Sequence, residues 1–308
     1  MNISELSTHV KMFFVKDMDL HMSVVKDPYF AHYINLFDPM FDTKKKLGLL
    51  LCAIESCGSE QAFLERGGEI RNAVISHIEA KAEYEDFRTF SVDEHRKVAP
   101  TYPAGNVYLP DNDLKVFVCI DMKEANFNAM RHFNDALVDG YQTYVEFLRS
   151  FTDIEYFLES KRIRQVIFGH LNPKRQQAIQ RYIIGQVFAY LLANDIKIED
   201  IVSVSSDEIV IQSSNYNDIL NIMEHRPCVQ DIPFRVDEFC LAKRGNDDFT
   251  FYVRYYLNGN SDIKCVPAAY MPEVIRNLRG ESPTGLDMVF YHDGRLCRFE
   301  KPLFSEGE

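Results

Sequence analysis

The feature that most constrains the fold is a segment about a third of the way along the chain, residues 98–112, where proline, glycine, asparagine and aspartate replace the regular patterns found on both sides. These residues interrupt helices and strands, so the segment predicts a connection between two structural units. A chain of 308 residues also exceeds the roughly 250 to 300 residues at which single cores stop growing. We therefore place a helical domain at residues 1–97, a linker at 98–113 and a second domain at 114–308.

The first unit reads as helical. Apolar residues such as Leu6 and Val10 recur at spacings of three and four, which is the period of one helix face. The same pattern predicts helices over residues 44–57 and 59–87, the second of them broken near Gly67-Gly68. Strand patterns are scarce before residue 98, so this unit is expected to be mostly α.

The second unit combines strands and helices. Lys115–Ile120 is a β-rich apolar run of the length of a buried strand, and a helical pattern follows over Glu124–Val138. A longer helix is predicted over Pro173–Asn194, with proline in its first turn and an asparagine before it that suits the N-cap. Residues 201–204 and 209–212 flank a polar turn and predict a β-hairpin. Further strands are predicted over 234–241, 249–257, 263–266, 288–291 and 296–299. The chain is therefore predicted to be an α+β protein.

Acidic residues stand where two of these strands end. Asp121 follows the apolar run of the first strand, and the pair Asp207 and Glu208 lies at the turn of the hairpin. Adjacent strands could bring them together on rigid supports, as a two-metal site for phosphoryl transfer requires. Hard divalent cations such as Mg²⁺ or Mn²⁺ take oxygen ligands, and the backbone carbonyl of Met122 could complete the set. The sequence thus predicts a metal site formed by Asp121, Met122, Asp207 and Glu208.

These two segments resemble the carboxylate motifs of the palm-type nucleotidyltransferases. That group includes the tRNA-His guanylyltransferases, reverse transcriptases, Y-family DNA polymerases, and the GGDEF and class III cyclases. Val116–Phe127 resembles the first motif and Val202–Ile211 the second, with a Ser-Asp-Glu form most similar to the guanylyltransferases. The resemblance implies a palm-like antiparallel sheet with helices on one face, followed by a β-rich carboxy-terminal extension. It also implies that Asp121 and Asp207 hold two metal ions, with Glu208 as the third acid.

The chain departs from the palm pattern at two points. Many palms carry an aromatic residue four or five positions after the first aspartate, whereas here those positions hold Ala125 and Asn126, with Phe127 one later. The interval from Asp121 to Asp207 is also longer than in a guanylyltransferase or GGDEF module. We therefore expect an insertion, which we place within residues 141–171.

A basic stretch lies between the two acidic motifs. From residue 161 to 181 there is no Asp or Glu, and six cations occur: Lys161, Arg162, Arg164, Lys174, Arg175 and Arg181. Cations in this position could neutralise a triphosphate or a nucleic-acid backbone, and those near a helix start add to its positive end. Lys174 and Arg175 are the first candidates, with Arg164 and Lys123 as further ones. The alternative is a solvated basic helix face.

The net charge and the cysteine content limit which binding partners and which cellular compartment we expect. The formal net charge of −12 argues against a broad nonspecific coat of nucleic acid, so a polymer contact should be confined to a groove. The longest uncharged apolar stretch, Leu47–Ile54, is far shorter than the roughly 20 residues of a membrane span. Seven scattered cysteines without a C-x-x-C spacing fit a reducing, cytoplasmic setting.

We therefore predict an enzyme that transfers an NTP or dNTP to the 3′-hydroxyl of an RNA or DNA end. Two alternatives stay open. One is a synthase of cyclic nucleotide or oligonucleotide signals, which uses the same chemistry. The other is a noncatalytic module that binds protein or nucleic acid, in which Asp121 caps the helix after its strand and Asp207-Glu208 is a solvated turn.

Overall fold

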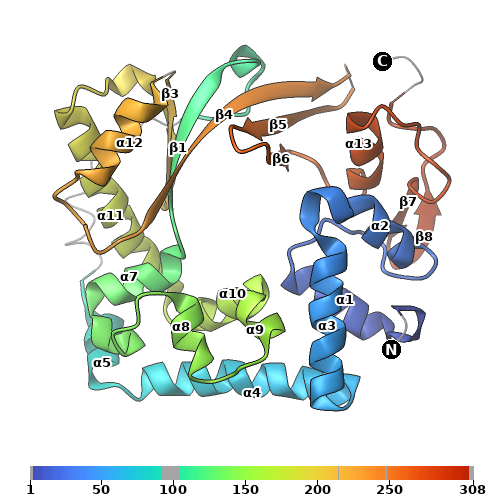
Figure 1. The fold of residues 1–308 in the computed structure, drawn as a ribbon, viewed down its shortest axis with the longest axis horizontal. Coiled ribbons are helices and arrows are strands. Elements are labelled where there is room, and N and C mark those ends of the chain that lie inside the picture. The colour runs from blue at the N-terminus through green and yellow to red at the C-terminus, as the bar shows by residue number, and fades with distance from the viewer. Residues whose placement is uncertain (1–2, 92–104, 214, 247, 305–308) are drawn as a thin grey trace.

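The computed structural model of the chain describes residues 3–91, 105–213, 215–246 and 248–304 (Figure 1). It confirms the predicted class: a mixed α+β fold, with a helical amino-terminal part, a six-stranded antiparallel sheet and a small two-stranded sheet near the carboxy terminus. No single helix in these ranges is both long and apolar enough to cross a membrane. Helices α3 and α4 meet that test only as a pair bent by 95°.

The amino-terminal part is built from α-helices, as predicted. They are α1 (Thr8–Asp17), α2 (Tyr29–Phe41), α3 (Thr43–Cys57), α4 (Glu60–Glu79) and α5 (Ala82–Thr89), preceded by a 3-10 turn at Ile3–Glu5. The predicted break at Gly67-Gly68 is wrong, because α4 runs through both glycines. A Cβ atom at Gly67 would lie 3.2 Å from the ring of Phe157, so the glycine allows a close approach between helices.

The six-stranded sheet has the order β2-β3-β1-β4-β5-β6, and all neighbouring pairs are antiparallel. Its strands are β1 (Val116–Met122), β2 (Ile201–Val204), β3 (Glu208–Gln212), β4 (Phe234–Gly245), β5 (Thr250–Tyr256) and β6 (Ser261–Lys264). The predicted hairpin is β2–β3. Along the chain, β1, helices, β2, β3, a helix and β4 follow one another, which is the element order of a split β-α-β arrangement.

Helices connect these strands. They are α7 (Ala125–Phe133), α8 (Tyr144–Arg149), α9 (Glu155–Glu159), α10 (Lys161–His170), α11 (Pro173–Ala193) and α12 (Tyr216–Glu224). The helix after β1 ends earlier than predicted, because Asn134 is extended and its side chain caps a separate 3-10 turn at Asp135–Val138. Helices α8, α9 and α10 lie within residues 141–171, the segment in which we predicted an insertion.

The long helix α11 begins with Pro173, as predicted, but Asn172 does not cap it. Asn172 has left-handed backbone angles and no side-chain capping bond. Its side-chain amide instead donates to the hydroxyl of Tyr84, at 2.8 Å. The asparagine therefore ties α11 to α5.

The carboxy-terminal part folds back onto the amino-terminal helices (Figure 1). Helix α13 (Met271–Leu278) is followed by the hairpin of β7 (Val289–His292) and β8 (Arg295–Arg298). His32 of α2 contacts the buried carboxylate of Asp287 at 2.6 Å, and the Tyr33 hydroxyl donates to the Leu286 carbonyl at 3.0 Å. These bonds join segments that lie far apart in the sequence.

The two faces of the sheet differ in what covers them. Val118, Ile120 and Met122 of β1 belong to the large core cluster, which includes side chains of α7, α11 and α12 and reaches from Leu6 to Phe304. The other face carries a smaller cluster around Phe117, Cys119 and Phe239, packed against Val107 and Tyr108 just before β1. The division into two domains stays a prediction, and residues 98–104 of the predicted linker lie outside the described residues.

Candidate functional site

The predicted acids meet at one end of the β1–β3 pair. Asp121 lies directly opposite Glu208 in the antiparallel register. Next to them, the backbone N–H of Met122 donates to the carbonyl oxygen of Asp207, at 2.8 Å. The Asp207 carboxylate accepts a hydrogen bond from the Ser205 hydroxyl, at 2.9 Å. Asp121 and the pair Asp207 and Glu208, which lie far apart in the sequence, are therefore neighbours in the fold.

Strand alternation decides which way these acids point. Successive side chains of a strand point to opposite faces, so Asp121 shares a face with Cys119 and not with Ile120. Glu208 is on the same face, because its carboxylate accepts from the Cys119 thiol at 3.2 Å. Asp121 and Glu208 thus lie on the face with the smaller apolar cluster, away from the face that carries Val118, Ile120 and Met122 and is packed with side chains of α7, α11 and α12. We call this the charged face.

A buried arginine holds Glu208. The guanidinium of Arg254 donates to both carboxylate oxygens of Glu208, at 3.2 and 3.4 Å. Arg254 is only 6% exposed and lies over the rings of Phe239, at 4.5 Å, and Tyr108, at 5.4 Å. Strands β1 and β4 separate β5 from β3, so this contact requires the sheet to curl around the charged face.

A second arginine and a fourth acid complete the cluster. Arg235 lies opposite Asp121 on β4, and its Nη2 is 3.3 Å from the Asp121 carboxylate. Its Nε donates to Asp237 at 2.8 Å. Sequence reasoning missed Arg235, Asp237 and Arg254, although all three lie in strands that were predicted. Charged residues at alternate positions of a strand, as at 235 and 237, were the available sign of a charged sheet face.

The two facing carboxylates differ in their proton affinity. Burial raises the pKa of Asp121 to about 6; Glu208, Asp207 and Asp237 add to this rise, and only Arg235 opposes it. Burial would also raise the pKa of Glu208, but the charge and hydrogen bonds of Arg254 bring it below its ordinary value. Glu208 is therefore held as a carboxylate, whereas Asp121 takes up a proton more readily than an exposed aspartate.

The residues present suit a hard divalent cation in their chemistry, since they offer carboxylate oxygens on paired strands. In the arrangement described here Arg254 contacts both oxygens of Glu208, and Arg235 contacts one oxygen of Asp121. Among the described residues, no group of three or more His, Cys, Asp or Glu side chains is gathered so that it could hold a metal ion. Metal binding at this site would require Arg235 to leave Asp121. The part predicted for the Met122 carbonyl stays a prediction.

The predicted phosphate-binding cations are distributed differently. Arg164 lies over the ring of Tyr144 at 5.8 Å, and Arg175 over the ring of Phe90 at 5.7 Å. Lys174 is exposed in the first turn of α11, and Lys123 is exposed one residue after β1. The charges that act most strongly on Asp121 belong to β3, β4 and the turn before β3, and none of them is one of these four cations. Lys123 alone of the four lies close to the acids in the sequence, two residues after Asp121.

The aromatic residue after the first acid is part of the core. Phe127 is fully buried and packs against the rings of Tyr144, Phe147 and Phe168. The preceding residue is Asn126, whose side-chain oxygen accepts from the amide of Gln180 on α11, at 2.7 Å. The start of α7 is therefore fixed against α11 by a polar contact.

Comparison with known proteins yields no relative: no family model, no curated protein and no solved structure matches this chain. The function has to be argued from the charged face itself.

Proposed function

We propose that the chain is a metal-dependent nucleotidyltransferase whose acids are Asp121, Asp207 and Glu208. The observation that supports it is the direct opposition of Asp121 and Glu208 on adjacent strands, with the backbone of Asp207 bonded to Met122 alongside. Paired strands hold carboxylates rigidly, which is what phosphoryl transfer needs of its ligands. Bound Mg²⁺ or Mn²⁺ would supply charge neutralisation at the reacting phosphate.

The substrates follow from this chemistry and from charge. The donor would be an NTP or dNTP, and the acceptor a 3′-hydroxyl at an RNA or DNA end. Lys123 is the cation best placed to meet the triphosphate, and Arg235 becomes available for it when the Asp121 carboxylate turns to another partner. A net charge of −12 confines any polymer contact to a local groove. A synthase of cyclic or short oligonucleotides would use the same residues.

A second candidate is a noncatalytic binding module, and the two arginines favour it. Glu208 accepts two hydrogen bonds from a buried guanidinium, and Asp121 faces Arg235. Ion pairs with a buried arginine, such as Arg254 with Glu208, also occur where charges only hold a fold together. In this case the acids stabilise the curled sheet, and partners bind elsewhere.

Activity of the full chain separates these proposals. The purified protein is incubated with labelled NTPs and dNTPs, with Mg²⁺ or Mn²⁺, with and without RNA or DNA ends. We expect metal-dependent labelled product from the wild type and at least a hundredfold less from Asp121→Asn and Asp207→Asn, as for the loss of a principal electrostatic group. Product size separates strand extension from cyclic or short products.

The matched control is Asp195→Asn. Asp195 is exposed and has left-handed backbone angles, which asparagine accepts. This variant should retain full activity. Absence of product under every condition, or equal activity in the Asp121 and Asp195 variants, would reject the enzyme and leave the binding module.

A further inference from the structure

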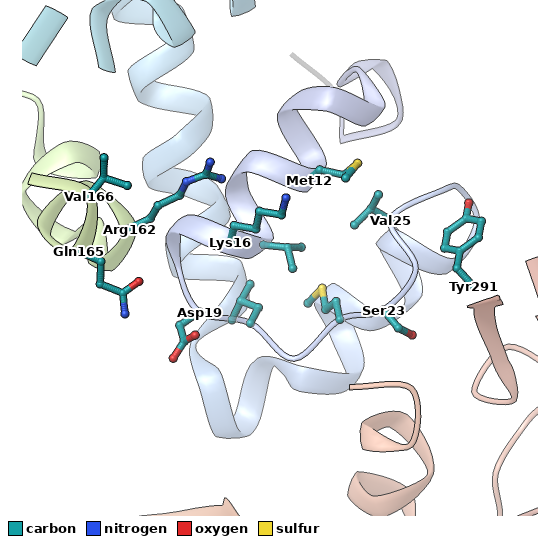
Figure 2. A pocket seen from close by; sticks show the side chains of 12 residues that line it. Met12, Lys16, Asp19, Ser23, Val25, Arg162, Gln165, Val166 and Tyr291 are labelled. Atoms are coloured by element: carbon teal, nitrogen blue, oxygen red, sulfur yellow. The ribbon is translucent and has the colours of Figure 1, made fainter. Parts of the chain in front are cut away.

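A pocket lies between α1, the segment after it, α10 and β7, and its lining includes none of the acids or arginines of the charged face. Figure 2 shows α1 along its floor, Val166 of α10 at one end and Tyr291 of β7 at the other. Its volume is about 680 Å³, which is within the range of roughly 300 to 1,000 Å³ usual for small-molecule sites. Elements from three distant parts of the sequence therefore enclose a space large enough for a ligand.

Exposed apolar side chains gather at this pocket. Met12, Val166 and Tyr291 are 45%, 38% and 43% exposed, and all three line it. Leu296, 41% exposed, pairs with Tyr291 across the β7–β8 hairpin. Single exposed apolar residues are ordinary, but a group of them around a hollow marks a binding surface. Most of the apolar lining is aliphatic, which suits an alkyl chain better than a flat base.

The side chains that line the pocket carry more positive than negative charge. The exposed side chain of Lys16 has no hydrogen bond or ion pair with any described residue, and the guanidinium of Arg162 lies over the ring of Phe13 at 5.4 Å. The one acid in the lining, Asp19, is already bonded to Lys161 at 2.5 Å. In Figure 2 the ends of Lys16 and Arg162 lie on one side of the pocket and the Asp19 carboxylate on the other. In a protein of net charge −12, this favours an anionic ligand.

We infer that the pocket binds an amphiphilic carboxylate with an aliphatic chain of medium length. The chain lies against Met12, Val25 and Val166, and the carboxylate meets Lys16 and Arg162. An ion pair at the rim of an apolar pocket fixes the orientation of such a ligand. This site is separate from the acids of the proposed nucleotidyl transfer and does not depend on that proposal.

Titration of the full chain with dodecanoate, below its micelle concentration, tests the inference. Calorimetry should show saturable binding of one ligand, with the uncharged dodecanol weaker and the cationic dodecyltrimethylammonium weaker still. Lys16→Gln should weaken dodecanoate binding about tenfold, as expected for the loss of one charge-assisted hydrogen bond. Val166→Asp places a negative charge on an exposed lining position and should weaken it further.

Lys45→Gln is the matched control, because Lys45 is an exposed lysine on α3 outside the pocket. It should leave the affinity unchanged, and all variants should keep the circular dichroism of the wild type. Three results would overturn the inference: no saturable binding, equal binding of the cationic amphiphile, or equal weakening in the Lys16 and Lys45 variants. Tight binding of an acidic amphipathic peptide without binding of dodecanoate would also overturn it.

Discussion

Two carboxylates in different regions of the molecule, Glu208 and Asp17, have their pKa values shifted in opposite directions. On the charged face, Glu208 accepts two hydrogen bonds from Arg254, and its pKa is below the ordinary value. At the junction of α1, α9 and α10, Asp17 is fully buried and accepts one bond, from the Tyr156 hydroxyl at 3.1 Å. Its other oxygen has no hydrogen-bond partner among the described residues.

The partner of each carboxylate sets the direction of its pKa shift. Burial raises the pKa of Asp17 to about 7, and the hydrogen bond from Tyr156 and the more distant charge of Arg162 oppose this only in part. Burial acts on Glu208 as well, but a guanidinium in contact outweighs it. Glu208 thus stays charged because Arg254 contacts both of its oxygens. Among the described residues, no arginine is in hydrogen-bond contact with Asp17.

The largest expected effect is at Asp17 and depends on pH. The folded chain holds a proton on Asp17 up to pH about 7, whereas the unfolded chain releases it near 3.8. The wild type should therefore lose stability as pH rises between these values, by at most about 1.4 kcal/mol per pH unit and on the order of 4 kcal/mol in all. Asp17→Asn removes this loss. The free energy of unfolding of the variant, relative to that of the wild type, should therefore rise up to pH about 7 and stay constant above it.

Urea unfolding of both proteins from pH 4.5 to 8.5 measures this difference. Asp195→Asn serves as the control, because an exposed aspartate should give no such trend. A constant difference between wild type and Asp17→Asn across the range would show that Asp17 is already ionised in the folded chain.

The next effect is the removal of the arginine. Arg254→Met keeps an apolar chain between Tyr108 and Phe239 but leaves Glu208 without its partner. Losing one member of a buried pair typically costs about 3 to 5 kcal/mol. Since the Glu208 side chain is 28% exposed, we expect about 2 to 3 kcal/mol from urea unfolding at pH 7.

A double variant shows whether the unpaired charge is responsible. Adding Glu208→Gln to Arg254→Met removes that charge and should restore most of the lost stability. The penalty of the single variant should also shrink as pH falls below the ordinary glutamate pKa of 4.5, because protonation then removes the charge. If the double variant is no more stable than Arg254→Met, the loss comes from packing around the guanidinium.

Much of the fold could be read from the sequence because its signals are local. The run before Asp121 and the two halves of the β2–β3 hairpin alternate or cluster apolar residues within a few positions, so their strands were predictable. The glycines of α4 misled because their effect is set by Phe157, which is distant in the sequence. A local pattern cannot show that a glycine lies under the ring of another helix.

Of the candidate site, the acids were predictable from the sequence and the arginines were not. The meeting of Asp121 with Glu208 follows once their strands are neighbours, and strand ends made that plausible. The arginines were not accessible, because Arg235 and Arg254 reach the acids only through the pairing of β1 with β4 and the curl of the sheet toward β5. Conversely, the basic residues of 161–181 formed a conspicuous pattern, yet Arg164 and Arg175 lie against aromatic rings.

The smallest expected effect on stability is at Arg235, and it sharpens the contrast with Arg254. Both arginines pair with an acid of the same face, but the Arg235 side chain is 56% exposed. Exposed ion pairs contribute between about 0 and 1 kcal/mol, so Arg235→Gln should change the free energy of unfolding by less than about 0.5 kcal/mol. A loss as large as that of Arg254→Met would show that the pair with Asp121 is structural.

Arg235→Gln should strengthen metal binding, although its effect on stability is small. Arg235 occupies the Asp121 carboxylate, and a divalent cation at the proposed site must displace it. Arg235→Gln should therefore bind Mn²⁺ at lower concentration than the wild type, as measured by the loss of the free Mn²⁺ electron paramagnetic resonance signal. Asp121→Asn should remove that binding in either background, since it removes the ligand and not its competitor. If Arg235→Gln and the wild type take up Mn²⁺ equally, the arginine does not compete for Asp121, and the cation, if bound, lies on other oxygens.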